Sequence, residues 1–136
     1  MACEPQVKFL AACWSSAAAR DLKLIGDASP HDLAVFERQV RSGEWQLWDV
    51  TYLGDRLGCL IWSVEHEGDA HSLIINAAAA RSVSGVDLTK AMLAAFQSIA
   101  TTSGARAIRC WTSRDGLRRK LENFGATSRY VMELTL

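Results

Sequence analysis

Residues 73–111 read LIINAAAARSVSGVDLTKAMLAAFQSIATTSGARAIRCW, and this stretch decides the fold. The apolar run at residues 73–75 indicates a buried strand. Asp87 is a favoured helix N-cap, and Gly104 is a favoured residue just past a helix C-terminus. The helix between them has one apolar stripe, formed by Leu88, Met92, Ala95, Phe96 and Ile99. A second, short strand is predicted at residues 107–111. The stretch therefore predicts a β-α-β crossover with parallel strands and a right-handed connection.

The residues before this unit predict two helices and three strands. Residues 6–13 resemble a strand, and an alanine-rich helix is expected at residues 15–25. Ser29 and Pro30 form a strong helix start, and Gly43 can end that helix. Alternating side chains predict a strand at residues 48–52. A turn at Gly54 and Asp55 then leads to a second strand at residues 57–64, and residues 65–70 are expected to form a polar hairpin loop.

The residues after the unit predict one more helix and one more strand. Ser113 can cap the helix, and Gly125 can close it. The apolar face of this helix consists of Leu117, Leu121 and Phe124. Tyr130, Met132 and Leu134 alternate through a final strand. The predicted order is β-α-α-β-β-β-α-β-α-β. It indicates an α/β fold in which a mixed sheet has helices on both faces, as a single domain over residues 1–136.

Composition agrees with one globular domain. The chain has 136 residues, of which 49% are apolar and 22% charged, so it can bury a core without disulfides or a metal. Its cysteines, Cys3, Cys13, Cys59 and Cys110, show no CxxC spacing and predict reduced thiols in the cytoplasm. We expect neither a signal peptide nor a transmembrane helix. His66 and His71 match no metal-ligand spacing, so we expect a solvated turn and no metal there.

Charge is balanced overall but unevenly distributed. Fifteen basic and fifteen acidic side chains cancel, yet residues 104–136 contain seven Lys or Arg against three Asp or Glu. This basic end favours a phosphate group or an acidic protein surface, although a solvated helix face is the plainer interpretation. Nucleic acid is not an expected partner, because the aromatic residues that stack on single-stranded bases are missing there.

Three stretches carry a resemblance to a known family. They read TKAMLAAF at residues 89–96, GARAI at 104–108 and GLRRKLENFG at 116–125. Together with the element order, they resemble the GNAT superfamily of acyl-CoA-dependent N-acyltransferases: its central helix, the following strand, and the helix that ends in Leu-Gly-Phe. The resemblance covers residues 44–136, whereas residues 1–43 share only the order of elements. GEWQLW at 43–48 and GVD at 85–87 resemble short GNAT-like proteins encoded by bacteriophages.

The resemblance implies that the loop before the central helix holds the pyrophosphate of CoA. The family pattern is Arg/Gln-x-x-Gly-x-Gly/Ala. In one register Ser84 stands at the Arg/Gln position, Asp87 at the first Gly and Thr89 at the Gly/Ala position. In the other register Arg81 stands at the Arg/Gln position, and Ser84 and Val86 occupy the small-residue positions. If acetyl-CoA binds, the expected contact residues are Ala79, Ser84, Gly85, Val86, Asp87, Leu88 and Thr89.

Asp87 argues against tight binding in that pose. An acidic N-cap stabilises its helix by about 0.5–2 kcal/mol. The same carboxylate would face the pyrophosphate, and two unit charges about 4 Å apart repel by about 4 kcal/mol at an effective dielectric constant of about 20. The helix dipole returns only about 1 kcal/mol. We therefore expect CoA to bind poorly unless Asp87 turns away.

The positions that carry catalysis in the family are also replaced. Leu121 stands where members often have a Tyr general acid, and Arg114 stands where they often have Asn. A general base is often a Glu on a central strand, and Glu65 is the weak candidate here because it borders the polar hairpin loop. The catalytic residues are therefore unknown.

Two functions remain open. The favoured one is a GNAT-fold binding or structural module with a degenerate acyl-CoA site, encoded by a phage and acting in the host cytoplasm or the virion, with no cofactor. A protein partner or a second copy would contact Trp45, Trp48, Arg114, Arg118 and Arg119. The alternative is an acetyl-CoA-dependent N-acetyltransferase in which an unknown amine attacks the thioester directly.

Overall fold

The computed structural model describes residues 6–25, 30–111, 115–129, 132 and 134. The elements are β1 (Val7–Ala12), α1 (Ser16–Lys23), α2 (Pro30–Arg41), β2 (Gln46–Tyr52), β3 (Asp55–Glu67), β4 (Ala70–Ala80), α3 (Leu88–Ser103), β5 (Ala107–Cys110) and α4 (Asp115–Asn123). This order agrees with the prediction as far as α4. Of the predicted final strand, Tyr130 lies outside the described residues, and Met132 and Leu134 are exposed and belong to no strand.

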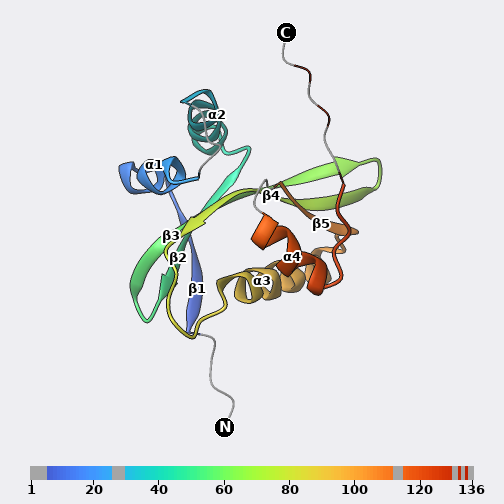
Figure 1. Cartoon of the computed structure of the whole chain (residues 1–136). Coiled ribbons are helices and arrows are strands. Elements are labelled where there is room, and N and C mark those ends of the chain that lie inside the picture. The colour runs from blue at the N-terminus through green and yellow to red at the C-terminus, as the bar shows by residue number, and fades with distance from the viewer. Residues whose placement is uncertain (1–5, 26–29, 112–114, 130–131, 133, 135–136) are drawn as a thin grey trace.

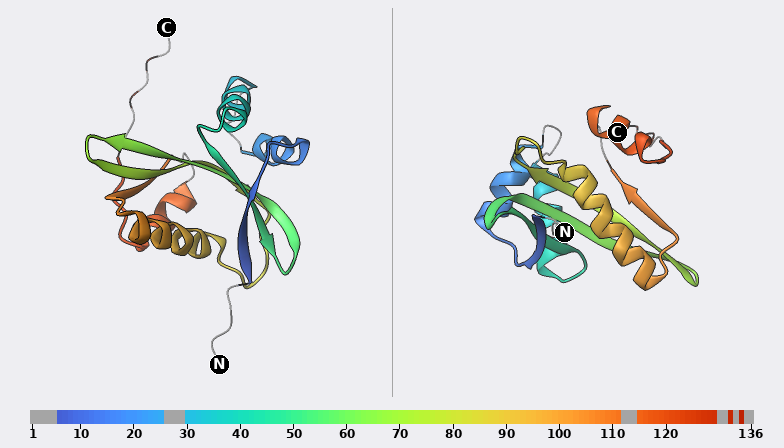
Figure 2. Two further views of the ribbon diagram at one scale, coloured as in Figure 1. Left: turned by 180° about the vertical axis from the view of Figure 1, so that it is seen from behind. Right: turned by 90° about the horizontal axis from the view of Figure 1, so that it is seen from below.

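The strands form one sheet in the order β1-β2-β3-β4-β5. Neighbours are antiparallel except β4 and β5, which are parallel, as the β-α-β crossover predicts. Helices α1 and α2 lie on one face of the sheet and α3 on the other (Figure 1), and in the view from below α3 runs in much the same direction as the β3–β4 hairpin (Figure 2). The predicted α/β class, with a mixed sheet between helices, is confirmed.

Each face of the sheet has its own core. On the α3 face, Phe96 is fully buried beside Met92, and its ring stacks on Trp48 with centroids 5.4 Å apart. The rings of Trp62 and Phe96 pack in a T-shaped arrangement with their centroids 5.5 Å apart. The opposite face is packed by α1 and α2 around Ala18, Leu22, Leu47, Cys59, Ile61 and Ala77. The predicted apolar stripe of the long helix is therefore confirmed where it matters most, at Met92 and Phe96.

The ends of α3 follow the sequence closely. The Asp87 carboxylate accepts a 3.0 Å hydrogen bond from the N–H of Lys90, and Gly104 closes the helix in the left-handed conformation. These are the favoured geometries of an acidic N-cap and a C-terminal glycine. Ser29 and Ser113, the predicted caps of α2 and α4, lie outside the described residues.

Two predicted hairpin connections were wrong in detail. The turn between β2 and β3 is centred on Leu53 and Gly54, both with positive φ, because the mirror-image turn matches the twist of the strands. Strands β3 and β4 extend to Glu67 and from Ala70, so the predicted loop at residues 65–70 shrinks to two residues. Polar side chains fit these strands because this end of the hairpin is largely exposed.

Candidate functional site

Strands β4 and β5 separate partway along β4. Their pairing runs from Ser72 opposite Ala107 to Ile75 opposite Cys110, where β5 ends, whereas β4 continues to Ala80. Ile61 of β3 pairs with Ala77 and Trp62 pairs with Ile75, so Asn76 is an extra residue, a β-bulge. A bulge bends its strand. Strand β4 therefore turns away from β5 at Asn76, and we call this divergence the β4–β5 splay.

Successive residues of β4 direct their main-chain N–H and C=O groups alternately toward β3 and toward the splay. The N–H of Arg81 donates a 3.0 Å hydrogen bond to the carbonyl of Leu57 on β3. Successive residues of a strand turn their N–H and C=O groups to opposite sides. Ala79 therefore directs its main chain toward β3, and Ala78 and Ala80 direct theirs toward the splay. The sequence predicts Ala79 as a contact residue and does not include Ala78 or Ala80, because this alternation depends on a register that only the paired strands define.

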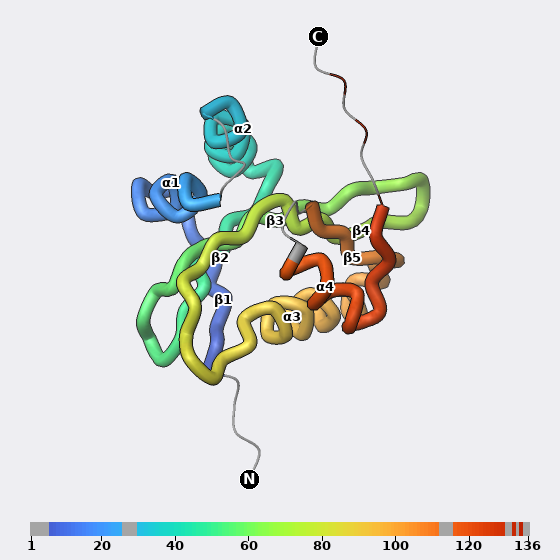
Figure 3. The backbone as a smooth tube through the Cα atoms, viewed as in Figure 1, coloured from blue at the N-terminus to red at the C-terminus, as the bar shows by residue number. Residues whose placement is uncertain are grey.

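The loop that the resemblance assigns to the pyrophosphate connects the end of β4 to α3, and its path can be traced in Figure 3. The N–H of Val86 donates to the carbonyl of Val83, which closes a turn with Gly85 at a φ of 78°. Helix α3 then starts at Leu88. The amides of Leu88 and Thr89 lie in the first helical turn, where no carbonyl of the helix can accept their hydrogen bonds. This end of α3 therefore presents donors and the positive end of a helix dipole.

Asp87 remains on this helix end, bonded to the N–H of Lys90. The Nζ of Lys120, on α4, lies 3.8 Å from the same carboxylate oxygen, and both side chains are about half exposed. The pair joins the element that follows β4 to the element that follows β5. An exposed pair is worth no more than about 1 kcal/mol, so Lys120 offsets only part of the repulsion between Asp87 and a phosphate.

The candidate base Glu65 lies away from the splay. It is on β3 opposite Ser72, at the end of the sheet where β4 and β5 remain paired. Its carboxylate is 3.6 Å from Arg109, which also contacts Glu67 at 2.7 Å. Glu65 therefore belongs to an ion-pair network that links β3 to β5 across the sheet. Leu121, at the family's Tyr position, is half-buried on α4 and offers no proton.

The predicted interaction residues have different surroundings. Trp45 packs on Phe36 with ring centroids 6.2 Å apart, and Trp48 belongs to the aromatic core under α3. Arg119 is exposed, and Arg118 lies 3.8 Å from Glu122 within α4. Arg114 is outside the described residues. Trp111, which is not among the predicted interaction residues, follows β5 beside the splay and is 57% exposed.

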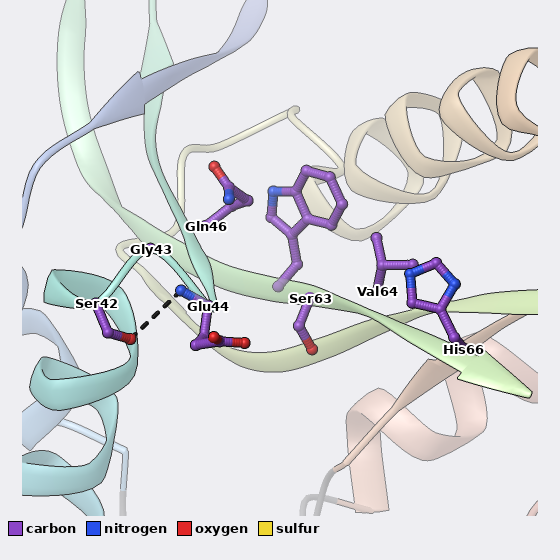
Figure 4. Close-up of a pocket in the computed structure, with 8 residues that line it drawn as sticks. Ser42, Gly43, Glu44, Gln46, Ser63, Val64 and His66 are labelled. Carbon is purple, nitrogen blue, oxygen red and sulfur yellow. Dashed lines mark hydrogen bonds between the residues drawn. The ribbon is translucent and has the colours of Figure 1, made fainter.

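Two hollows lie near these elements. One, of about 490 Å³, lies at the edge of β3 beside the start of β2 (Figure 4). The other, of about 290 Å³, is lined by Ala78, Ala79 and Ala80, and Arg56 borders it together with its 2.7 Å ion-pair partner Asp21.

Among the described residues, no three His, Cys, Asp or Glu side chains are arranged to hold a metal ion. None of the helices described has the length and apolar content to cross a membrane.

Comparison with known proteins identifies the fold. No family model and no curated protein sequence matches the chain. A ribosomal-protein-alanine N-acetyltransferase from Brucella melitensis biovar Abortus 2308 has a similar structure (TM-score 0.70, 13% identity, 96% of this chain and 98% of that one). So does a predicted acetyltransferase with acetyl-CoA from Clostridium acetobutylicum (TM-score 0.63, 12% identity, 95% and 96%). A transcriptional regulator from Bacillus halodurans C-125 is also similar (TM-score 0.71, 13% identity, 96% and 99%).

The chain therefore has the GNAT acetyltransferase fold, as the sequence resemblance implies. Sequence identities of 12–13% establish the fold and nothing further about activity.

Proposed function

We propose that this chain is an acetyl-CoA-dependent N-acetyltransferase, the alternative that the sequence left open. One observation carries the proposal: the β4–β5 splay begins at a bulge and leads to the N-terminus of α3. In this arrangement a strand edge can bind an extended acyl carrier while the helix end binds its phosphates. The likeness to named acetyltransferases over nearly the whole chain supports this function over a structural module.

The residues of the splay have distinct tasks in this proposal. The amides of Leu88 and Thr89 would receive the pyrophosphate, and the main chain of Ala80 would pair with the amide-containing arm of the substrate. The thioester would then lie near Ile75 and Asn76, where the strands meet. An amine nitrogen attacks the carbonyl carbon, the C–S bond breaks, and the departing CoA thiolate takes up the proton that the nitrogen loses, so the products are the amide and free CoA thiol. No described side chain at this point is an evident base, so the amine would enter in its neutral form.

Asp87 favours a second candidate, a binding module that has lost the acyl-CoA site. Its carboxylate already accepts the hydrogen bond of the Lys90 amide, and it forms an ion pair with Lys120 of α4. The phage origin and virion role expected from sequence stay predictions within this second candidate.

Calorimetric titration with acetyl-CoA separates the two candidates. Asp87→Asn keeps the capping oxygen but removes the charge. Relief of about 4 kcal/mol of repulsion, less at most about 1 kcal/mol that Lys120 offsets, should let acetyl-CoA bind it about a hundredfold more tightly than wild type. Asp69→Asn removes a charge from the exposed β3–β4 turn and should leave the affinity unchanged. Release of free CoA thiol with a panel of polyamines and lysine peptides then tests transfer. Absence of binding to both wild type and Asp87→Asn at millimolar acetyl-CoA would leave the binding module as the better account.

A further inference from the structure

One edge of β3 is open beyond the start of β2. Strand β2 begins at Gln46, which pairs with Trp62, whereas β3 continues to Glu67. Within the described residues no strand pairs with this part of β3 on the β2 side. The open edge, residues 63–67, is therefore a place where another strand could pair.

The hydrogen-bond pattern shows which main-chain groups the open edge offers. The carbonyls of His71 and Ile75 accept hydrogen bonds from Arg106 and Trp111, so these β4 residues face β5. By alternation, Ser72 and Ile74 face β3, and their partners Glu65 and Ser63 face β4. The N–H and C=O groups of Val64 and His66 consequently point outward, toward the side that β2 leaves open.

A hollow of about 490 Å³ adjoins this edge. It is lined by the α2–β2 connection at Ser42, Gly43 and Glu44, by Gln46, and by Val64 and His66 of β3. Figure 4 shows Ser42 and Glu44 on one side and Val64 and His66 farther along β3. The hollow therefore continues the line of β2 past Gln46 and has room for side chains of an added strand.

The two faces of the edge differ in chemistry. Val64 is 42% exposed and lies on the α3 face with His66, whereas Glu65 and Glu67 lie on the other face. Glu44 and Asp69 add two exposed carboxylates at its ends. Among the described residues, Arg106 and Arg109 form ion pairs with Glu67, and Arg109 also lies near Glu65, so two cations face four acidic groups. Directly opposite side chains in paired strands share a face. An apolar side chain would therefore suit the position opposite Val64, and a cationic one the position opposite Glu65.

We propose that the β3 edge at Val64 and His66 binds an extended peptide of another protein, with alternating apolar and basic side chains, as an added strand in line with β2. Main-chain hydrogen bonds provide the affinity, and the carboxylates select the basic face. A second copy of this chain fits less well, because an antiparallel pair of β3 edges would bring acidic side chains of both copies together. The proposal holds whether or not acetyl-CoA binds.

A capped ten-residue peptide of alternating lysine and valine is the probe. Hydrogen exchange measured by NMR should slow at the amides of Val64 and His66 when the peptide is added, and the affinity should fall as NaCl increases. A peptide with aspartate in place of lysine should bind much more weakly. So should a lysine–valine peptide N-methylated at every second residue, because it cannot pair with a strand. This last comparison leaves the protein itself unchanged.

A matched pair of variants isolates the main-chain contact. Val64→Pro removes an outward N–H without breaking the β3–β4 pairing, and it should weaken binding about fivefold or more. Val64→Ala keeps the N–H and should retain most of the affinity. Equal binding of the N-methylated peptide, or slowed exchange confined to other residues, would overturn the proposal. So would a dimer in sedimentation experiments whose Val64 and His66 amides are protected without peptide.

Discussion

The side-chain amide of Asn76 donates a 2.9 Å hydrogen bond to the hydroxyl of Ser63, across β3 and β4 at the bulge where the β4–β5 splay begins. Both side chains are half-buried. The bond ties the extra residue of β4 to its neighbour strand, and so it holds the bend that opens the sheet.

Removing this bond should loosen the bulge. Asn76→Ala and Ser63→Ala should each lower the free energy of unfolding by about 1 kcal/mol, and the double variant should lose less than the sum. Urea unfolding of the four proteins measures the coupling. Strictly additive losses would show that the bond contributes nothing of its own.

Gly58 should tolerate no side chain. A Cβ atom there would lie 1.9 Å from the carbonyl oxygen of Ala79, in the backbone of β4. Gly58→Ala should therefore destabilise the protein by about 3 kcal/mol or more, since the two strands must move apart. Gly116→Ala is the matched control: its Cβ would meet nothing within 4 Å, and alanine favours a helix by up to about 1 kcal/mol. Urea midpoints that fall equally for both variants would refute this account of Gly58.

Asp87 should stabilise α3 mainly through its capping hydrogen bond. Asp87→Ala should lose about 1 kcal/mol in the free energy of unfolding, and Asp87→Asn should lose almost nothing because the amide oxygen still accepts the bond. Thermal and urea unfolding at moderate salt measure both. If Asp87→Asn loses as much as Asp87→Ala, the ion pair with Lys120 is the larger contribution.

Cys59 should make stability depend on pH in the alkaline range. Burial, with a further contribution from nearby Asp21, raises the pKa of the thiol from 9.0 to about 12. The folded protein therefore keeps this proton where the unfolded chain releases it. The free energy of unfolding should fall as pH rises from about 9 toward 12, by at most about 1.4 kcal/mol per pH unit.

The variant Cys59→Ala isolates this effect from the titration of other groups. The stability of wild type should decline more steeply than that of Cys59→Ala between pH 8 and 11 in urea unfolding experiments. Parallel curves would contradict the raised pKa. Folded wild type should also be alkylated at the exposed Cys13 well before Cys59, which peptide mass spectrometry can follow.

The sequence predicted those features that depend on local chemistry. The Asp87 cap, the Gly104 stop and the stripe through Met92 and Phe96 follow from residues adjacent in the chain or on one helix face, so their spacing suffices. The parallel pairing of β4 and β5 follows because a helix connects them.

Features that depend on strand register could not be predicted. The bulge at Asn76, the outward main chain of Ala80 and the open edge at Val64 each require knowledge of which residues pair. The prediction of a loop beginning at Glu65 was wrong, because polar residues are common both in exposed strands and in loops. Counting tryptophans was also insufficient: Trp48 completes an aromatic core, whereas Trp111 is exposed beside the splay.

Four consecutive alanines, from Ala77 onward, form the arm of β4 that leaves its parallel neighbour. Their methyl groups alternate between the two faces: Ala79 lines the smaller hollow beside Leu24 and Ile25 of the α1 face, whereas Ala78 packs on the α3 face. Valine or leucine in place of Ala79 would narrow this hollow without removing a strand hydrogen bond, whereas the same change at Ala78 would act on the packing under α3. The packing on each face of this arm can therefore be altered separately, one side chain at a time.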